Sequence, residues 1–185
     1  RPVILAVPGH YIAAVGFDTY VRLLEETVQE LRGEPAPLEV HSTLNLGLDI
    51  RIPPEYRADE HQRLRAYKKI AEADGPGRAE EVLAELSDRY GPPPGAVRSL
   101  VDFSVLKSIA QKLGVESIDR RQGMVNIKLH PESRIDPQRL MAVVTSTPGA
   151  QFTPAGVLRL HADGQREAER LLDFLKSRLS DLAPR

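Results

Sequence analysis

The chain contains no cysteine. Disulfide bonds and thiolate metal sites are therefore excluded, which is consistent with the reducing cytosol. No segment approaches the run of about 18 apolar residues that a transmembrane helix requires. The apolar stretch PVILAV near the N-terminus is too short for a signal peptide. These absences predict a cytoplasmic protein that has no membrane partner.

A strong charge of one sign is also lacking. The 185 residues include 25 Lys and Arg against 26 Asp and Glu, which gives a formal net charge of −1. A dedicated nucleic-acid-binding domain is normally strongly basic, so this balance argues against that class of protein. The hydrophobic content of 41% and the charged content of 28% are those of an ordinary globular domain. Because the chain starts at Arg1 and not at methionine, we interpret it as a fragment of a longer protein.

The common catalytic and ligand-binding motifs are absent. The sequence has neither a glycine-rich phosphate-binding loop that ends in Lys-Ser or Lys-Thr nor a Gly-x-Ser-x-Gly nucleophile elbow. No two histidines have the i, i+3 or i+4 spacing of metal ligands on a helix; the five are His10, His41, His61, His130 and His161. We therefore predict no catalytic residue, no cofactor and no metal ion. A small enzyme of another kind is the alternative, and it requires a pocket with several perturbed titratable groups.

The N-terminal part carries one amphipathic helix and a linker. Apolar residues form one stripe along residues 17–31, which predicts a helix there. The proline-rich segment GEPAPLE at residues 33–39 follows and indicates a boundary. We therefore divide the chain into a connecting segment, residues 1–37, and one domain, residues 38–185.

The strongest periodic pattern lies in residues 38–52. The apolar residues occupy even positions, with Ser42 as the only gap: Leu38, Val40, Leu44, Leu46, Leu48, Ile50 and Ile52. A period of two places all of them on one face of an extended segment, which predicts a half-buried strand or a pair of strands. Pro53 and Pro54 end this segment because proline cannot donate a hydrogen bond within a sheet.

Three helices are predicted next. Asp59, with Gln62 three residues later, forms a variant of the capping box that begins the first helix. The second helix is expected from about Arg78 to Tyr90, where the motif GPPPG ends it. The third is expected from Pro94 to about residue 113. Its apolar arc is wide and includes Val101 and Ile109, so we expect it to be the most buried helix.

The last third of the sequence repeats one simple unit. The segments VESID and MVNIKLH predict two strands, and Asp136 followed by Pro137 predicts the start of a helix. The segments AQFT and VLRLH predict a second strand pair, which a leucine-rich amphipathic helix follows. The predicted fold class is therefore α+β: a helical subdomain, then two strand–strand–helix units that form a small, mostly antiparallel sheet with helices on one face.

Basic residues gather around the first predicted helix of the domain: Arg57, Arg63, Arg65, Lys68 and Lys69. Arg65, Lys68 and Lys69 lie away from the apolar stripe, which is typical of a solvated face. Arg63 lies beside the stripe, so we expect a carboxylate partner for it. This arrangement favours a solvated face over phosphate contacts. A nucleic-acid-binding appendage of a helicase-like protein is the alternative function.

Glu85 and Asp88 form an acidic pair on the second predicted helix. Their i, i+3 spacing places both carboxylates on one helix face, away from the apolar stripe. Nothing in the pattern indicates the burial or crowding that separates the pKa values of a catalytic acid and base. Two interpretations remain: a face that keeps the helix soluble, or a charged docking face for an arginine-rich partner.

The same stretches carry a resemblance to a known family. The segments IPPEYRADEHQRLRAYKKIAEA, ELSDRYGPPPGAV and AQKLGV resemble the C-terminal domain of bacterial transcription-repair coupling factors. The segment GHYIAAVGFDTYVRLLEETVQELRGE resembles the stretch that joins the motor of these proteins to that domain. Together the matches cover most of residues 9–115 in the family's order.

The resemblance implies a regulatory function without catalysis in this fragment. Members of the family bind stalled RNA polymerase, use ATP and magnesium to move along DNA, displace the polymerase and recruit the excinuclease A subunit of nucleotide excision repair. Their C-terminal domain docks on the N-terminal module and masks the excinuclease-binding surface, which is an autoinhibitory contact. Acidic residues of an ELxDR helix pair there with arginines. In this sequence those residues are Glu85 and Asp88.

Overall fold

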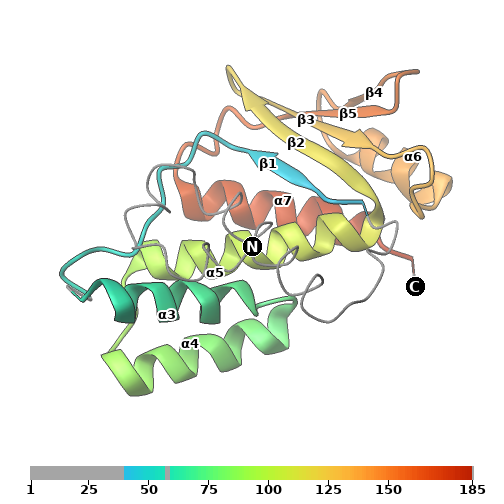
Figure 1. The fold of residues 1–185 in the computed structure, drawn as a ribbon. Helices are drawn as coiled ribbons and strands as arrows, with labels where there is room; N and C mark the ends of the chain where they lie inside the picture. The colour runs from blue at the N-terminus through green and yellow to red at the C-terminus, as the bar shows by residue number, and fades with distance from the viewer. Residues whose placement is uncertain (1–39, 57–58, 185) are drawn as a thin grey trace. The chain divides into compact units, whose positions relative to one another are not determined.

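Five helices and five strands make up the part of the chain that the structure, a computed structural model, describes: residues 40–56 and 59–184 (Figure 1). In chain order they are β1 (Thr43–Asn45), α3 (Glu60–Ala71), α4 (Pro76–Tyr90), α5 (Gly95–Leu113), β2 (Val115–Arg121), β3 (Met124–Leu129), α6 (Pro137–Ser146), β4 (Gln151–Phe152), β5 (Val157–His161) and α7 (Ala168–Leu182). The helix predicted at residues 17–31, the proline-rich linker and the boundary at residue 37 lie outside the described residues.

The described residues form two compact units. The helical unit is Ile50–Ser104, and the sheet unit comprises Val40–Asp49 and the residues from Val105 onward. The boundary between Ser104 and Val105 falls inside α5. None of the helices in the described ranges is long and apolar enough to cross a bilayer.

The helices of the helical unit begin where local chemistry predicts. The Asp59 carboxylate accepts hydrogen bonds from the backbone N–H groups of His61, at 2.8 Å, and Gln62, at 3.3 Å, which confirms it as the cap of α3. Proline suits the first turn of a helix because its missing N–H is not needed there. Accordingly, α4 begins at Pro76, two residues before the predicted start at Arg78.

The segment that precedes α3 is fixed to the helices by two tyrosines. The Tyr67 hydroxyl oxygen accepts a hydrogen bond of 2.7 Å from the backbone N–H of Ile52. Tyr67 is buried, and this burial raises the pKa of its hydroxyl above the ordinary value. The Tyr56 hydroxyl donates a 2.9 Å hydrogen bond to the carbonyl of Gly91, just after α4. These bonds satisfy backbone groups that lie outside regular secondary structure.

The alternating segment is only partly a strand. Ser42, Leu44 and Leu46 are buried while their neighbours are exposed, so the predicted half-buried face is confirmed for this stretch. The regular strand is nevertheless confined to Thr43–Asn45, and it pairs with β2 instead of forming a strand pair of its own. Gly47 has a φ of 66°, and this left-handed conformation ends the extended run soon after β1.

The sheet has the strand order β1-β2-β3-β5-β4. The β1–β2 pair is parallel and the other three pairs are antiparallel. Each hairpin is followed by a helix, α6 or α7, and the hairpins are joined because β3 pairs with β5. Figure 1 shows α7 along one face of the sheet, and five of its leucines are buried. The predicted α+β fold with two strand–strand–helix units is confirmed.

The third predicted helix is the most buried one, as expected. In α5, Val97, Leu100, Val101 and Leu106 have at most 1% of their surface exposed. Ile109, which the apolar arc also includes, is only half-buried.

Gly114, between α5 and β2, supports a prediction about stability. Its φ is 77°, and a Cβ atom placed on it would lie 2.9 Å from the Cα of Ser133. Ser133 cannot retreat easily because its hydroxyl donates a 2.7 Å hydrogen bond to the carbonyl of Leu113. A left-handed conformation costs a residue with a Cβ about 1–2 kcal/mol, and overpacking costs about 1–3 kcal/mol. We therefore expect Gly114→Ala to lower the free energy of unfolding by about 2–5 kcal/mol in a urea titration.

A second glycine provides the control for this measurement. Gly95, at the start of α5, has no atom within 4 Å of its ideal Cβ position and no left-handed φ. Gly95→Ala should leave stability unchanged or raise it by up to about 1 kcal/mol. Equal effects of the two substitutions would contradict the packing described for Gly114.

Candidate functional site

The predicted docking residues lie on α4, where Glu85 is partly exposed and Asp88 is exposed. Val82 and Leu86 are the buried residues of this helix, and they define the face that packs against the rest of the helical unit. Glu85 and Asp88 lie off that face, as the helical spacing predicts. Neither carboxylate is buried, whereas an acid–base pair needs burial to separate the two pKa values.

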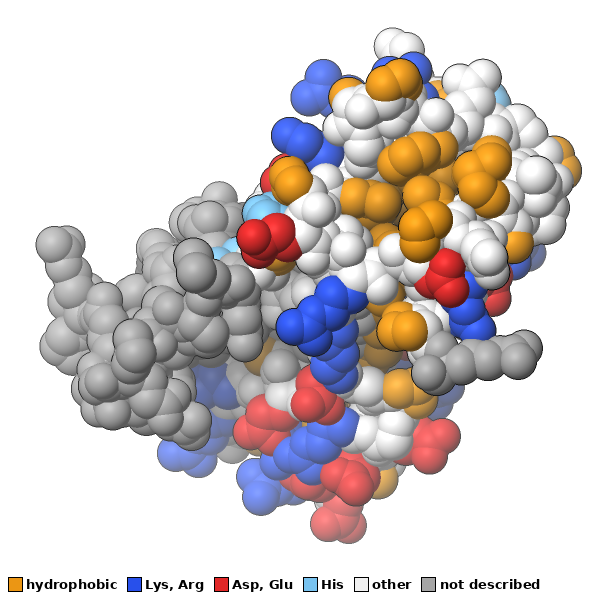
Figure 2. Space-filling view, turned by 90° about the vertical axis from the view of Figure 1, so that its right-hand side faces the viewer, with side chains coloured by type: hydrophobic (Ala, Val, Ile, Leu, Met, Phe, Trp, Pro, Cys, Tyr) orange, Lys and Arg blue, Asp and Glu red, His pale blue; other side chains and the backbone are white. Residues whose placement is uncertain are grey.

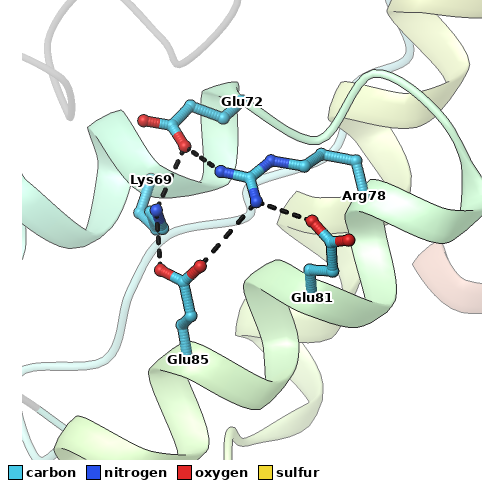
Figure 3. Close-up of polar contacts among 5 residues, drawn as sticks. All are labelled: Lys69, Glu72, Arg78, Glu81 and Glu85. Carbon is cyan, nitrogen blue, oxygen red and sulfur yellow. Dashed lines mark hydrogen bonds and ion pairs between the residues drawn. The ribbon is translucent and has the colours of Figure 1, made fainter.

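Glu85 belongs to a network of five charged side chains at the ends of α3 and α4 (Figure 3). The Lys69 ammonium lies 2.6 Å from Glu85 Oε2 and 3.2 Å from Glu72 Oε2. The Arg78 guanidinium contacts Glu72, lies 2.8 Å from Glu81 Oε2 and lies 3.7 Å from Glu85 Oε1. We call these residues the ion network. Two cations in it face three carboxylates.

The ion network sets the protonation of Glu85. The hydrogen bond from Lys69 is the main reason that the pKa of Glu85 is below the ordinary carboxyl value. The same bond, followed by the one that Lys69 donates to Glu72, raises the pKa of Lys69. The contribution of Glu85 to stability is therefore complete above the ordinary carboxyl pKa and is lost as the pH falls through the lowered value. Because 39% of the Glu85 side chain is exposed, solvent screens this contribution.

Asp88 lies in a different environment from Glu85. It is exposed on α4 and forms no ion pair with any residue in 40–56 or 59–184. The structure therefore places the two predicted docking carboxylates on one side of the helix, where one is held by Lys69 and the other extends into solvent.

The basic residues of α3 do not all behave as predicted. Arg65 is exposed, which agrees with a solvated face. The prediction is wrong for Lys69, whose ammonium binds the carboxylates of Glu72 and Glu85. Periodicity within α3 shows which side of the helix is polar, but Glu85 comes from α4. Arg57 lies outside the described residues, and the carboxylate partner expected for Arg63 stays a prediction.

The i, i+3 ion pairs were a signal that sequence reasoning missed. Lys69 with Glu72 and Arg78 with Glu81 both have this spacing, which brings side chains together on a helix or at its end. Their positions on either side of the break at Gly75 indicate that charges meet where α3 ends and α4 begins.

The sheet unit contains a second feature that the sequence analysis did not predict, an apolar hollow of about 460 Å³. It is lined mainly by Leu129, Ile135, Leu140, Phe152 and Pro154. Figure 2, which views the molecule from the side where α6 and β4 lie, shows hydrophobic side chains gathered on that face. The hollow has one titratable lining residue, His130, and therefore no pair of acid–base groups.

Within residues 40–56 and 59–184, no three His, Asp or Glu side chains are placed so that they can hold a metal ion.

Comparisons with known proteins agree on one family. The model of the TRCF domain matches residues 46–140. The transcription-repair-coupling factor of Myxococcus xanthus is 31% identical over 173 residues, which cover 93% of this chain and 14% of that protein. The protein of the same name from Escherichia coli K12 is 30% identical over 139 residues, or 72% of this chain and 12% of its own length. The chain thus spans a small part of the curated relatives that it matches.

One solved structure is similar in fold. It is described as the crystal structure of the C-terminal domain of transcription-repair coupling factor. The TM-score is 0.69 and the sequence identity is 22%, and the match covers 80% of this chain and 95% of the other. The fold of this chain is therefore that of this C-terminal domain.

Proposed function

The chain belongs to the TRCF domain family, and we propose that it is a non-catalytic docking domain of a transcription-repair coupling factor. In this proposal the domain binds the N-terminal module of its parent protein through α4. The contact masks the surface that binds the excinuclease A subunit, and it opens when the parent engages stalled RNA polymerase.

The other activities are assigned to the rest of the parent protein. A motor outside this chain uses ATP and magnesium to move along DNA in the cytoplasm and displaces the polymerase. This assignment is supported by the sequence, which has no phosphate-binding loop ending in Lys-Ser or Lys-Thr.

The position of Glu85 and Asp88 is the observation that best supports the docking role. Glu85 is partly exposed, Asp88 is exposed, and the two lie three positions apart on one helix, so a single partner surface can reach both. Carboxylates favour arginine as a partner because its planar guanidinium can donate two parallel hydrogen bonds. The ion pairs of Lys69 argue against the nucleic-acid alternative, because an ammonium held by two carboxylates is not available to phosphate.

A binding titration tests this function directly. The 185-residue chain is titrated with the purified N-terminal module in a calorimeter, at low and at high salt. We expect saturable binding that weakens with salt, because salt screens exposed charges. Glu85→Gln combined with Asp88→Asn should weaken binding by about 2- to 30-fold, which corresponds to two ion pairs of about 0.2–1 kcal/mol each.

The matched control removes two other exposed carboxylates. Glu60 and Glu80 lie on α3 and α4 and form no ion pair with other described residues. Glu60→Gln combined with Glu80→Gln changes the net charge equally and should leave the affinity nearly unchanged. Equal weakening by both double substitutions would mean that overall charge, and not the α4 pair, governs docking.

A further inference from the structure

We propose that Lys69 competes with the docking partner for Glu85. Its ammonium binds Glu85 in the undocked chain. When a partner arginine binds Glu85, the Lys69 ammonium keeps only its contact with Glu72. This inference rests on the proposed function. It identifies Lys69 as a residue of this chain that limits the docking affinity.

The geometry shows that Glu85 is already occupied. Lys69 Nζ lies 2.6 Å from Glu85 Oε2, and Arg78 approaches the other oxygen, Oε1, at 3.7 Å. A guanidinium that binds Glu85 through two parallel hydrogen bonds needs both oxygens. A partner guanidinium therefore competes with the Lys69 ammonium at Oε2 and with the more distant Arg78 at Oε1.

Both cations keep another carboxylate after this exchange. The Lys69 ammonium lies 3.2 Å from Glu72 Oε2 before any partner arrives. Arg78 contacts Glu72 and lies 2.8 Å from Glu81 Oε2. Neither helix has to move to supply these second partners, as Figure 3 shows. Both cations can therefore release Glu85 without losing every carboxylate contact in the ion network.

The side-chain chemistry favours exchange over permanent pairing. An ammonium is a compact and strongly hydrated charge, whereas a guanidinium is weakly hydrated and matches the two oxygens of a carboxylate. A partner arginine can therefore displace Lys69 from Glu85. The measured affinity of docking is therefore lower than it would be if Glu85 had no contact with Lys69 in the undocked chain. The difference in binding free energy is the free energy of the Lys69 contact that is lost.

The proposal predicts that neutralising Lys69 strengthens docking. Lys69→Gln keeps a side chain of moderate length and removes the charge that competes for Glu85. An exposed ion pair is weak, so the affinity for the purified N-terminal module should rise by only about 1.5- to 5-fold.

The neighbouring lysine provides the control. Lys68 is partly exposed on α3 and forms no ion pair with other described residues. Lys68→Gln changes the net charge by the same amount, so it reports the general effect of charge on docking. Lys69→Gln should raise the docking affinity more than Lys68→Gln does. Equal gains from the two substitutions would overturn the proposal.

A second comparison isolates the contact itself. In the Glu85→Gln background the competition no longer exists, so Lys69→Gln should then have only the effect of Lys68→Gln. If Lys69→Gln raises the affinity in that background as much as it does when Glu85 is present, the proposal is also overturned. Circular dichroism spectra and thermal unfolding of each variant verify that affinities are compared between folded proteins.

Failure of the proposed function gives a different result. If Glu85→Gln combined with Asp88→Asn leaves the affinity unchanged, docking does not use α4, and both proposals are wrong. If that pair weakens binding but Lys69→Gln and Lys68→Gln act alike, docking uses α4 without competition from Lys69. Only the further inference is then wrong.

Discussion

Glu85→Arg combined with Asp88→Arg in the full-length parent protein is expected to raise its affinity for the excinuclease A subunit by up to about 50-fold without RNA polymerase. That figure applies if the masked state holds about 99% of the molecules and the substitutions bring masked and open states to equal populations. Such a shift needs about 2.7 kcal/mol. Two arginines that face arginines supply repulsion as well as the loss of two ion pairs.

Asp88→Arg alone is a single substitution whose effect is simpler to interpret than that of the double substitution. Glu85→Arg also places a cation beside Lys69 and Arg78, which hold the native carboxylate. Asp88 forms no ion pair with the other described residues, so Asp88→Arg changes the proposed docking face without disturbing the ion network. We expect it to act in the same direction as the double substitution, with a smaller effect.

The measurement is a titration of the excinuclease A subunit with the parent protein and its variants. Glu60→Arg combined with Glu80→Arg is the matched control, since it makes the same charge change elsewhere on the exposed surface of α3 and α4. Circular dichroism verifies folding. Unchanged affinity in a folded Glu85→Arg, Asp88→Arg variant would contradict a masking contact through these two residues.

Leu106→Ala in α5 is expected to lower the free energy of unfolding by about 2–5 kcal/mol. Leu106 is fully buried, so the substitution removes apolar contacts and leaves a cavity. Ile109→Ala, three residues later on the same helix, should cost less because Ile109 is only half-buried. Lys68→Ala should change stability little because an exposed single charge contributes little.

Chemical denaturation of the three variants tests this order. The slope of the free energy against denaturant must stay constant for the comparison to report stability alone. A larger loss from Ile109→Ala than from Leu106→Ala would contradict the packing of α5.

Local chemistry accounts for what the sequence predicted well. Asp59 and Asp136 cap α3 and α6 through their own carboxylates, so the start of each helix depends on residues close in the chain. Alternation of apolar residues likewise predicted the strands around Val125 and Leu158, because their burial follows directly from the period of a strand.

Contacts between distant segments account for what the sequence did not predict. The parallel pairing of Leu44 with Ile118 joins strands more than seventy positions apart, and no local pattern specifies such a partner. The position of Glu85 and Asp88 off the apolar stripe followed from their spacing within one helix. The contact between Lys69 and Glu85 did not, because it requires the packing of α3 beside α4.

The early position of β1 in the chain places residues Ile50–Ser104 between two segments of the sheet unit. The strand belongs to the sheet, yet the helical residues Ile50–Ser104 separate it from β2. A genetic cassette that carries α3 and α4 within residues 50–104 therefore has two junctions, after Asp49 and after Ser104, and the second interrupts α5. Trimming the chain from its N-terminus to residue 105 would remove β1 with the helices and leave β2 as an open edge, a template for unwanted pairing with other chains.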